Sequence, residues 1–330
     1  MNNPGRSKVE PGSRMLALVG PTCVGKTAVA LSIAPSLNAE IISVDSMQVY
    51  RGMDIGTSKP TPQEISHVTF HMLDVADPGI DFSVARFKEL ADGAVIDVVE
   101  RGRMPLLVGG SGLYYRAVVD DLDFSNAGAS AELRAEQEEL SDISDLELHQ
   151  LLRELDGKAA EAIPPSNRRR VLKAIEVARS GDRLISERQP SWNDFRSPYD
   201  LSVVGLEMNR ELLYRLIDQR VDAMMAAGLE EEVKRLSVQG LRGGTTAAEA
   251  LGYSQLIDYL DGKVSLDEAV ADIKVRTRNY AKRQLTWFRK DPRVKWFGVA
   301  VGSNSTNDIA GALADASGRV LEYLHHKLDN

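Results

Sequence analysis

Residues 20–27 combine glycines, a lysine and a threonine at a spacing that binds phosphates. The segment Gly20-Pro-Thr-Cys-Val-Gly-Lys-Thr27 matches the pattern Gly-x-x-x-x-Gly-Lys-Thr without a mismatch. Its glycines let backbone N–H groups turn inward, the lysine adds charge for the outer phosphates, and the Thr27 hydroxyl is placed to bind Mg²⁺. The sequence therefore predicts a diphosphate or triphosphate site made of Gly20, Pro21, Thr22, Cys23, Val24, Gly25, Lys26 and Thr27.

A carboxylate is expected beside this loop. Asp45 ends the apolar segment 39–45, and open parallel sheets place their ligands at the carboxyl ends of strands. On one interpretation Asp45 caps the strand or binds Mg²⁺ through water. On the other it is a general base that takes a proton from a nucleophile beside the phosphates. Its position alone does not choose between the two.

A third candidate for function is a basic segment near the C-terminus. Residues 273–297 hold nine Lys or Arg against one acid, Asp291. At helical spacing, Arg276, Tyr280, Arg283 and Trp287 share one face, and basic residues interleaved with aromatics suit an RNA backbone with an unstacked base. The alternative is a solvated helix whose aromatics are core, and we expect Trp287 and Phe288 to be core residues.

Composition limits the classes of protein. The chain has 330 residues, 43% hydrophobic and 27% charged, as in globular proteins. The net charge of −8 argues against indiscriminate nucleic-acid binding, although local patches remain possible. A single cysteine excludes an internal disulfide framework. Without a membrane-span pattern or signal-peptide core, we expect a cytoplasmic protein with no membrane partner.

The pattern of elements that positions these groups is α/β. Buried strands are expected at 15–19, 39–45, 104–108, 201–206 and 294–299, and helices at 28–34, 83–101, 130–162, 168–179, 209–239, 247–260, 266–290 and 308–327. We predict an α/β fold with a parallel-sheet core of the phosphate-loop NTPase type, flanking helices and a helical insertion. The predicted parts are a disordered leader (1–14), a catalytic core with C-terminal helices (15–121 and 200–330) and a helical insertion domain (122–199).

Two further classes of function stay open at this point. A hydrolytic ATPase normally has a strand ending in a Mg²⁺-binding Asp, but strand 104–108 runs into Gly109-Gly110. A small-molecule kinase that uses ATP is compatible with Asp45 but has no need of the basic helix. An RNA-binding module without catalysis has no reason to keep both the phosphate loop and Asp45.

Several segments together resemble the tRNA dimethylallyltransferases, also called tRNA isopentenyltransferases, from about residue 15 to 298. The phosphate loop is shared with many enzymes, whereas the other segments are more specific. They are Ser43-Val-Asp-Ser-Met-Gln-Val-Tyr50, Gly56-Thr-Ser-Lys-Pro60, Gly109-Gly-Ser-Gly-Leu-Tyr114, Arg168–Val177, Arg215–Arg220, Gly252-Tyr-Ser-Gln255 and Thr277–Arg289.

The resemblance implies transfer of a prenyl group from dimethylallyl diphosphate to N6 of adenosine 37 in tRNA, next to the anticodon, with Mg²⁺ at Thr27. It implies that Asp45 is the base, that Thr22 orients the reacting groups, and that Arg220 clamps the diphosphate. The implied tRNA contacts are Asp45, Ser46, Met47, Gln48, Ser111, Arg134, Arg169 and Arg170, to which the basic helix adds Arg278 and Arg283. The usual state of the family is a monomer.

This chain departs from the family pattern at three positions. Cys23 stands where a smaller residue is usual, and we interpret it as a tolerated small side chain. Ser111 replaces the usual Thr and keeps the hydroxyl. Only His71 remains where the family commonly has paired histidines, which puts any catalytic role of His71 in doubt.

Overall fold

The structure, a computed structural model, describes residues 10, 12–120, 122, 140, 142–180, 184–188, 194–244, 246–300 and 308–329. The chain divides into two compact units. The first comprises Met1–Phe82, Phe87–Val119 and Ser197–Asn330, and the second comprises Ser83–Arg86 and Asp120–Arg196. Most of the expected leader, residues 1–9 and 11, lies outside the described residues.

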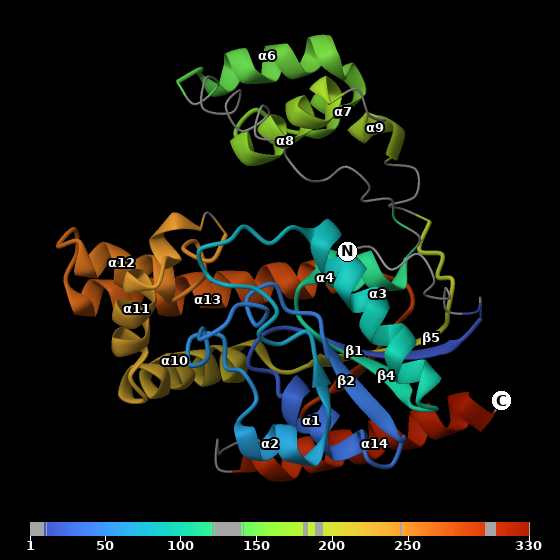
Figure 1. Cartoon of the computed structure of the whole chain (residues 1–330). Coiled ribbons are helices and arrows are strands. Elements are labelled where there is room, and N and C mark those ends of the chain that lie inside the picture. Colours follow the sequence, from blue (N-terminus) through green and yellow to red (C-terminus); the bar gives the residue numbers. More distant parts are fainter. Residues whose placement is uncertain are drawn as a thin grey trace. The chain divides into compact units, whose positions relative to one another are not determined.

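A six-stranded sheet forms the centre of the first unit (Figure 1). All neighbouring strands are parallel, in the order β3-β2-β4-β1-β5-β6. Parallel strands covered on both faces consist of nearly continuous apolar residues, and Met15 to Val19 are each at most 2% exposed. The predicted α/β class with a parallel sheet is confirmed. The strands are β1 (Arg14–Val19), β2 (Ala39–Ser43), β3 (Phe70–His71), β4 (Met104–Gly109), β5 (Asp200–Glu207) and β6 (Val294–Gly298).

Helices cover both faces of this sheet. On one face α1 (Lys26–Ile33) packs against α14 (Ile309–Asp329). The other face carries α3 (Val84–Glu100), α4 (Gly112–Val119) and α13 (Leu266–Phe288), with α4 in contact with α13 (Figure 1). From β1 the chain moves toward β2, and from β4 it moves in the opposite direction toward β5. Because both crossovers are right-handed, their helices lie on opposite faces of the sheet.

The segment expected to be helical over 209–239 consists of two helices. α10 (Arg210–Ala226) ends before Gly228, and α11 (Leu229–Val238) begins after it. Gly228 has φ 95°, a left-handed conformation that breaks a helix and that glycine adopts at little cost. Next in the chain come η2 (Leu241–Gly243) and α12 (Tyr253–Leu260), so the helix expected from residue 247 starts later. The short helix α2 (Pro62–His67) was not predicted.

The second unit is helical where the structure describes it. Its helices are α6 (Asp145–Leu155), α7 (Gly157–Ala162), α8 (Arg168–Arg179) and α9 (Ile185–Arg188). α6 begins with a capping box in which Ser144 and Glu147 satisfy each other's backbone N–H groups. The unit has its own hydrophobic core, built from Leu148, Leu152, Ala159, Ile163, Val171 and Ile175.

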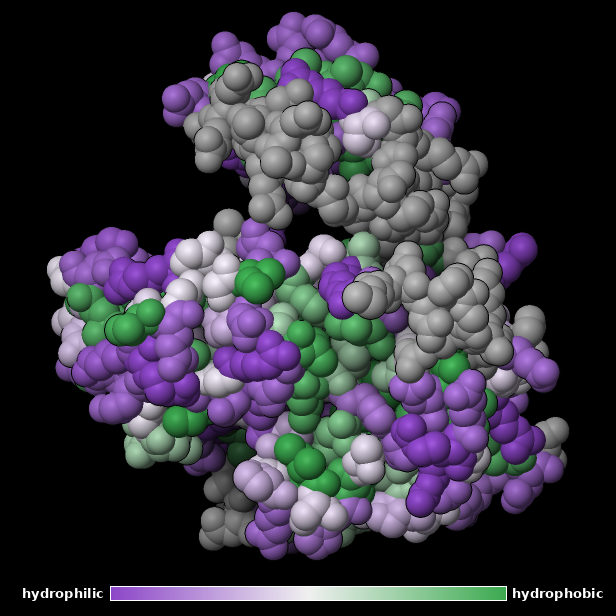
Figure 2. Space-filling model, in the orientation of Figure 1, coloured by the Kyte–Doolittle hydropathy of each residue, from purple (hydrophilic) through white to green (hydrophobic). Residues whose placement is uncertain are grey.

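Within the described part of the chain, no helix combines the length and apolar character required to cross a membrane. Figure 2 shows hydrophilic residues over much of α11 and α12, whereas hydrophobic residues are more frequent toward the middle of the first unit.

Candidate active site

The phosphate loop lies between the carboxyl end of β1 and the first turn of α1. Parallel strands end at a common edge of the sheet, so this loop lies beside the ends of β2 and β4. Cys23 has φ 65°, a conformation that favours glycine.

The ammonium group of Lys26 turns back over its own loop. Its Nζ donates hydrogen bonds to the carbonyl oxygens of Gly20, at 3.0 Å, and Pro21, at 2.7 Å. Burial lowers the pKa of Lys26 from 10.5 to about 8; nearby Asp45 opposes this shift and Arg220 adds to it. An anion bound in the loop would stabilise the charged form.

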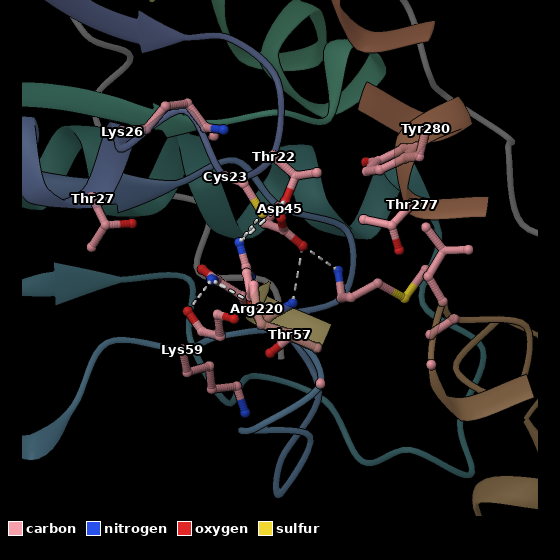
Figure 3. A pocket seen from close by; sticks show the side chains of 18 of the residues that line it. Thr22, Cys23, Lys26, Thr27, Asp45, Thr57, Lys59, Arg220, Thr277 and Tyr280 are labelled. Atoms are coloured by element: carbon pink, nitrogen blue, oxygen red, sulfur yellow. Dashed lines mark hydrogen bonds between the residues drawn. The ribbon is translucent and has the colours of Figure 1, made fainter. Parts of the chain in front are cut away.

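A second cation reaches the loop from α10. Nη1 of Arg220 donates to Thr22 Oγ1 at 3.2 Å and lies 3.4 Å from Cys23 Sγ (Figure 3). The fold thus brings together the arginine and the threonine that the family resemblance singled out, although 198 positions separate them. Two positive groups, Lys26 and Arg220, can offset part of the charge of a bound diphosphate.

Asp45 leaves one carboxylate oxygen available. Its Oδ1 accepts backbone N–H groups from Met47, at 2.8 Å, and Gln48, at 3.3 Å, which fixes the orientation of the carboxylate. For Oδ2 the structure gives no hydrogen-bond partner among the residues it describes. An outward oxygen held in this way can accept a proton from a bound nucleophile.

The side chain of Ser111 links the ends of β2 and β4. Its Oγ accepts the backbone N–H of Ser46 at 3.1 Å and lies 3.3 Å from the Ser46 hydroxyl oxygen. The amide of Gln48 is engaged within the protein, because it accepts from Ser43 Oγ and donates to the carbonyl oxygens of Thr57 and Ser58. Gln48 therefore holds the loop that follows Asp45 in place.

Lys26, Asp45, Gln48 and Arg220 line one cavity of about 880 Å³ (Figure 3), whereas Ser111 is not among its lining residues. This volume is in the range of small-molecule sites. Apolar side chains form part of its wall, among them Ile217, Val221, Met224 and Ile273. The lining also includes Thr22, Cys23, Gly25, Lys26, Thr27, Asp45, Ser46, Met47, Gln48, Arg220, Arg276, Thr277, Tyr280 and Arg283.

Two residues of α13 belong to the site although the sequence did not mark them as site residues. Burial raises the pKa of Tyr280 to about 12, and the negative charge of Asp45 adds to this. Gln284, 6% exposed, accepts the backbone N–H of Thr22 at 2.8 Å and donates to the carbonyl of Gly110 at 2.9 Å. Helical spacing places Tyr280 on one face with Arg276 and Arg283, and this pattern in the sequence indicates that Tyr280 could belong to the site. No local pattern indicates the two contacts of Gln284.

The predicted tRNA contacts differ in their surroundings. Arg283 lines the cavity, with its guanidinium 5.8 Å from the centre of the Tyr280 ring. Arg278 pairs with Asp218 at 2.8 Å. Arg169 and Arg170 are exposed in the first turn of α8, in the second unit. Arg134 lies outside the described residues.

The aromatics of α13 are only partly as expected. Phe288 is fully buried, which confirms the expectation of a core residue, whereas Trp287 is half-buried and lines a small hollow with Lys282 and Lys290. His71 binds Glu40 at 2.7 Å on the outer strands of the sheet, and Arg101 also pairs with Glu40, so His71 has a structural environment.

Known proteins resemble this chain in sequence and in structure over most of their length. The family model described as IPP transferase matches residues 48–291. The tRNA dimethylallyltransferase of Halalkalibacterium halodurans is 45% identical over 285 residues, 86% of this chain and 90% of that protein. The enzyme of the same name from Moorella thermoacetica is 45% identical over 314 residues, 93% of this chain and 96% of that protein.

Solved structures extend the comparison. The full-length tRNA isopentenylpyrophosphate transferase from Bacillus halodurans has a TM-score of 0.65 at 41% identity, covering 95% of this chain and 99% of that one. A eukaryotic dimethylallyltransferase acting on tRNA has a TM-score of 0.74 at 24% identity over 94% of this chain and 80% of that one, which shows a common fold. On the family match and on these identities, this chain belongs to the IPP transferase family.

Proposed function

We propose that this chain is a tRNA dimethylallyltransferase, which moves the dimethylallyl group from dimethylallyl diphosphate to N6 of adenosine 37 in tRNA. One observation carries the proposal. A single cavity contains the phosphate loop with Lys26 and Arg220, and also Asp45, whose second carboxylate oxygen has no partner among the residues that the structure describes. A leaving diphosphate and a weakly nucleophilic amine need these two kinds of group side by side. The names of the relatives favour this activity over the small-molecule kinase alternative.

In the proposed reaction the allylic C–O bond breaks and the diphosphate leaves with its electron pair. The adenine N6 forms the new C–N bond and gives up one proton to Asp45. Lys26, Arg220 and the backbone N–H groups of the loop stabilise the negative charge that builds on the leaving group. Thr22, between Arg220 and the loop backbone, orients the diphosphate. The acceptor adenine must leave its stack to enter the cavity.

Magnesium is proposed as the cofactor. Thr27 lines the cavity and its hydroxyl has no hydrogen-bond partner in the part of the chain that the structure describes, so it fits a metal ligand. The described residues contain no cluster of three or more His, Cys, Asp or Glu side chains that could hold a metal. This fits Mg²⁺, which often binds through few protein oxygens together with substrate phosphates and water. When bound, Mg²⁺ would add positive charge to the diphosphate.

For the RNA, we propose that residues after β2, after β4 and on α13 contact the anticodon loop. These are Asp45, Ser46, Met47, Gln48, Ser111, Arg278 and Arg283. Arg134, Arg169 and Arg170 would bind phosphates of the anticodon stem. We further propose that the enzyme acts as a monomer in the cytoplasm.

The test is incubation of the protein with dimethylallyl diphosphate, Mg²⁺ and tRNA that lacks the modification, followed by nucleoside analysis. We expect N6-dimethylallyladenosine and released diphosphate in equal amounts. A parallel reaction receives ATP and no prenyl donor. ATP turnover without any prenyl transfer in the first reaction would overturn the proposal and favour a kinase.

A further inference from the structure

A buried carboxylate on α11 holds the loop that follows Asp45. Oε2 of Glu232 accepts the backbone N–H groups of Asp54, at 3.1 Å, and Ile55, at 2.9 Å. Its Oε1 accepts the N–H of Gly56 at 3.2 Å and the hydroxyl of Tyr253 at 2.6 Å. Glu232 is 5% exposed and forms no ion pair with any described residue. The buried negative charge of Glu232 is therefore stabilised by four hydrogen bonds and not by a cation.

Tyr253 makes the arrangement rigid. It is fully buried at the start of α12, and burial together with the charge of Glu232 raises its pKa, which keeps the hydroxyl a donor. A Cβ atom at position 56 would lie 2.5 Å from the Tyr253 ring, so only glycine fits against it. The turn over residues 54–56 is therefore held by hydrogen bonds on one side and by an aromatic ring on the other.

From this turn, hydrogen bonds lead to Asp45. The carbonyl oxygens of Thr57 and Ser58 accept from Gln48 Nε2 at 3.1 and 3.2 Å. The other end of that amide accepts from Ser43, at the end of β2, at 2.8 Å. The backbone N–H of Gln48 then donates to Asp45 Oδ1. The orientation of the Asp45 carboxylate depends in this way on where residues 54–58 lie.

We propose that Glu232, together with Tyr253, is a positioning residue for the transfer reaction that acts through residues 54–58 and Gln48 on Asp45. This inference rests on the proposed function, in which Asp45 takes the proton from the adenine amine. Glu232 does not line the cavity, so its removal leaves the phosphate loop and its cations in place. The consequence is a loss in the chemical step and not in diphosphate binding.

The test compares Glu232→Gln with Glu231→Gln on the full-length enzyme. Glu231 is exposed in the same turn of α11, so its variant removes the same charge without touching the loop. We expect Glu232→Gln to lower the single-turnover transfer rate by about tenfold or more, because small misplacements of a reacting group are costly. We expect the KM for dimethylallyl diphosphate to stay within about twofold and Glu231→Gln to match the wild type. An unchanged rate in Glu232→Gln overturns the inference.

A second comparison separates positioning from a general loss of structure. In an Asp45→Ala background, Glu232→Gln should lower the residual rate by less than about twofold, since it acts through the group already removed. An equal, multiplicative loss in both backgrounds overturns the inference. Tyr253→Phe keeps the ring against Gly56 and removes one hydrogen bond, so it supplies the same test if Glu232→Gln does not fold. Failure of the wild-type enzyme to modify tRNA would instead contradict the proposed function.

Discussion

The backbone N–H of Thr22 donates a hydrogen bond of 2.8 Å to Oε1 of Gln284, a residue 262 positions further along the chain. The other end of the same amide donates to Gly110. One buried side chain on α13 therefore ties the phosphate loop after β1 to the end of β4. The helix expected to meet RNA and the loop expected to hold the diphosphate share this residue.

Replacing Gln284 with Ala should weaken both the fold and the site. It leaves the part-buried Thr22 N–H and the buried Gly110 carbonyl without their partner, and a buried unsatisfied group costs about 1–3 kcal/mol. We expect the free energy of unfolding to fall by about 2–4 kcal/mol and diphosphate affinity to fall with it. Denaturant unfolding and calorimetric titration measure both. Gln239→Ala, on the exposed end of α11, is the control and should change neither.

Asp45→Ala should reduce transfer to a small residual rate while leaving the affinity for tRNA within a few-fold. Removal of a general base typically costs about 10²–10⁴-fold in rate. Single-turnover kinetics and filter binding on the same preparation separate the two effects. Asp77→Ala is the control, because Asp77 pairs with Arg51 on the surface. A loss of tRNA binding comparable to the loss of rate would make Asp45 a contact residue and not the base.

Diphosphate affinity should fall as the pH rises above the pKa of Lys26, which burial has lowered to about 8. Below that pH the free protein carries the charged ammonium that the anion needs. Above it, binding must take up a proton, so the apparent affinity should fall by up to about tenfold per pH unit. Titrations with dimethylallyl diphosphate across this pH range measure the slope of log affinity against pH.

Lys26→Met is the control for that titration, since ionisation of the ligand affects both proteins equally. The variant should bind dimethylallyl diphosphate more weakly. Its affinity should also lack the part of the pH dependence that the ionisation of Lys26 causes. Identical slopes in the two proteins would mean that Lys26 does not titrate in this range.

Arg283→Ala should reduce the salt dependence of tRNA binding more than Arg278→Ala does. Arg283 lines the cavity without an ion pair among the described residues, whereas the charge of Arg278 is already offset by Asp218. Loss of one phosphate contact lowers the slope of log affinity against log salt by about one. Binding of an anticodon stem-loop over a range of salt concentrations measures it. Lys263→Ala is a matched surface control, and an unchanged slope in Arg283→Ala would remove this side chain from the RNA contacts.

Features that depend on residues close together in the chain could be recognised before the fold was known. The phosphate loop is contiguous, and the apolar runs of β1, β2 and β4 are typical of buried parallel strands. The α/β class, the order of these strands along the chain and the long basic helix could therefore be predicted. The resemblance to a family added Arg220, whose position on α10 has no local signal.

The distant residues that hold the site together meet only in the folded chain. Gln284 meets Thr22 and Gly110, and Glu232 meets residues 54–56, through pairs that lie 174 to 262 positions apart. Such contacts leave no periodicity in the sequence, because each depends on the packing of whole helices against the sheet. The ion pair of Arg278 and the half-buried state of Trp287 were decided in the same way. Charge and helical spacing place side chains on a face, but neighbouring elements determine which of them remain available to bind.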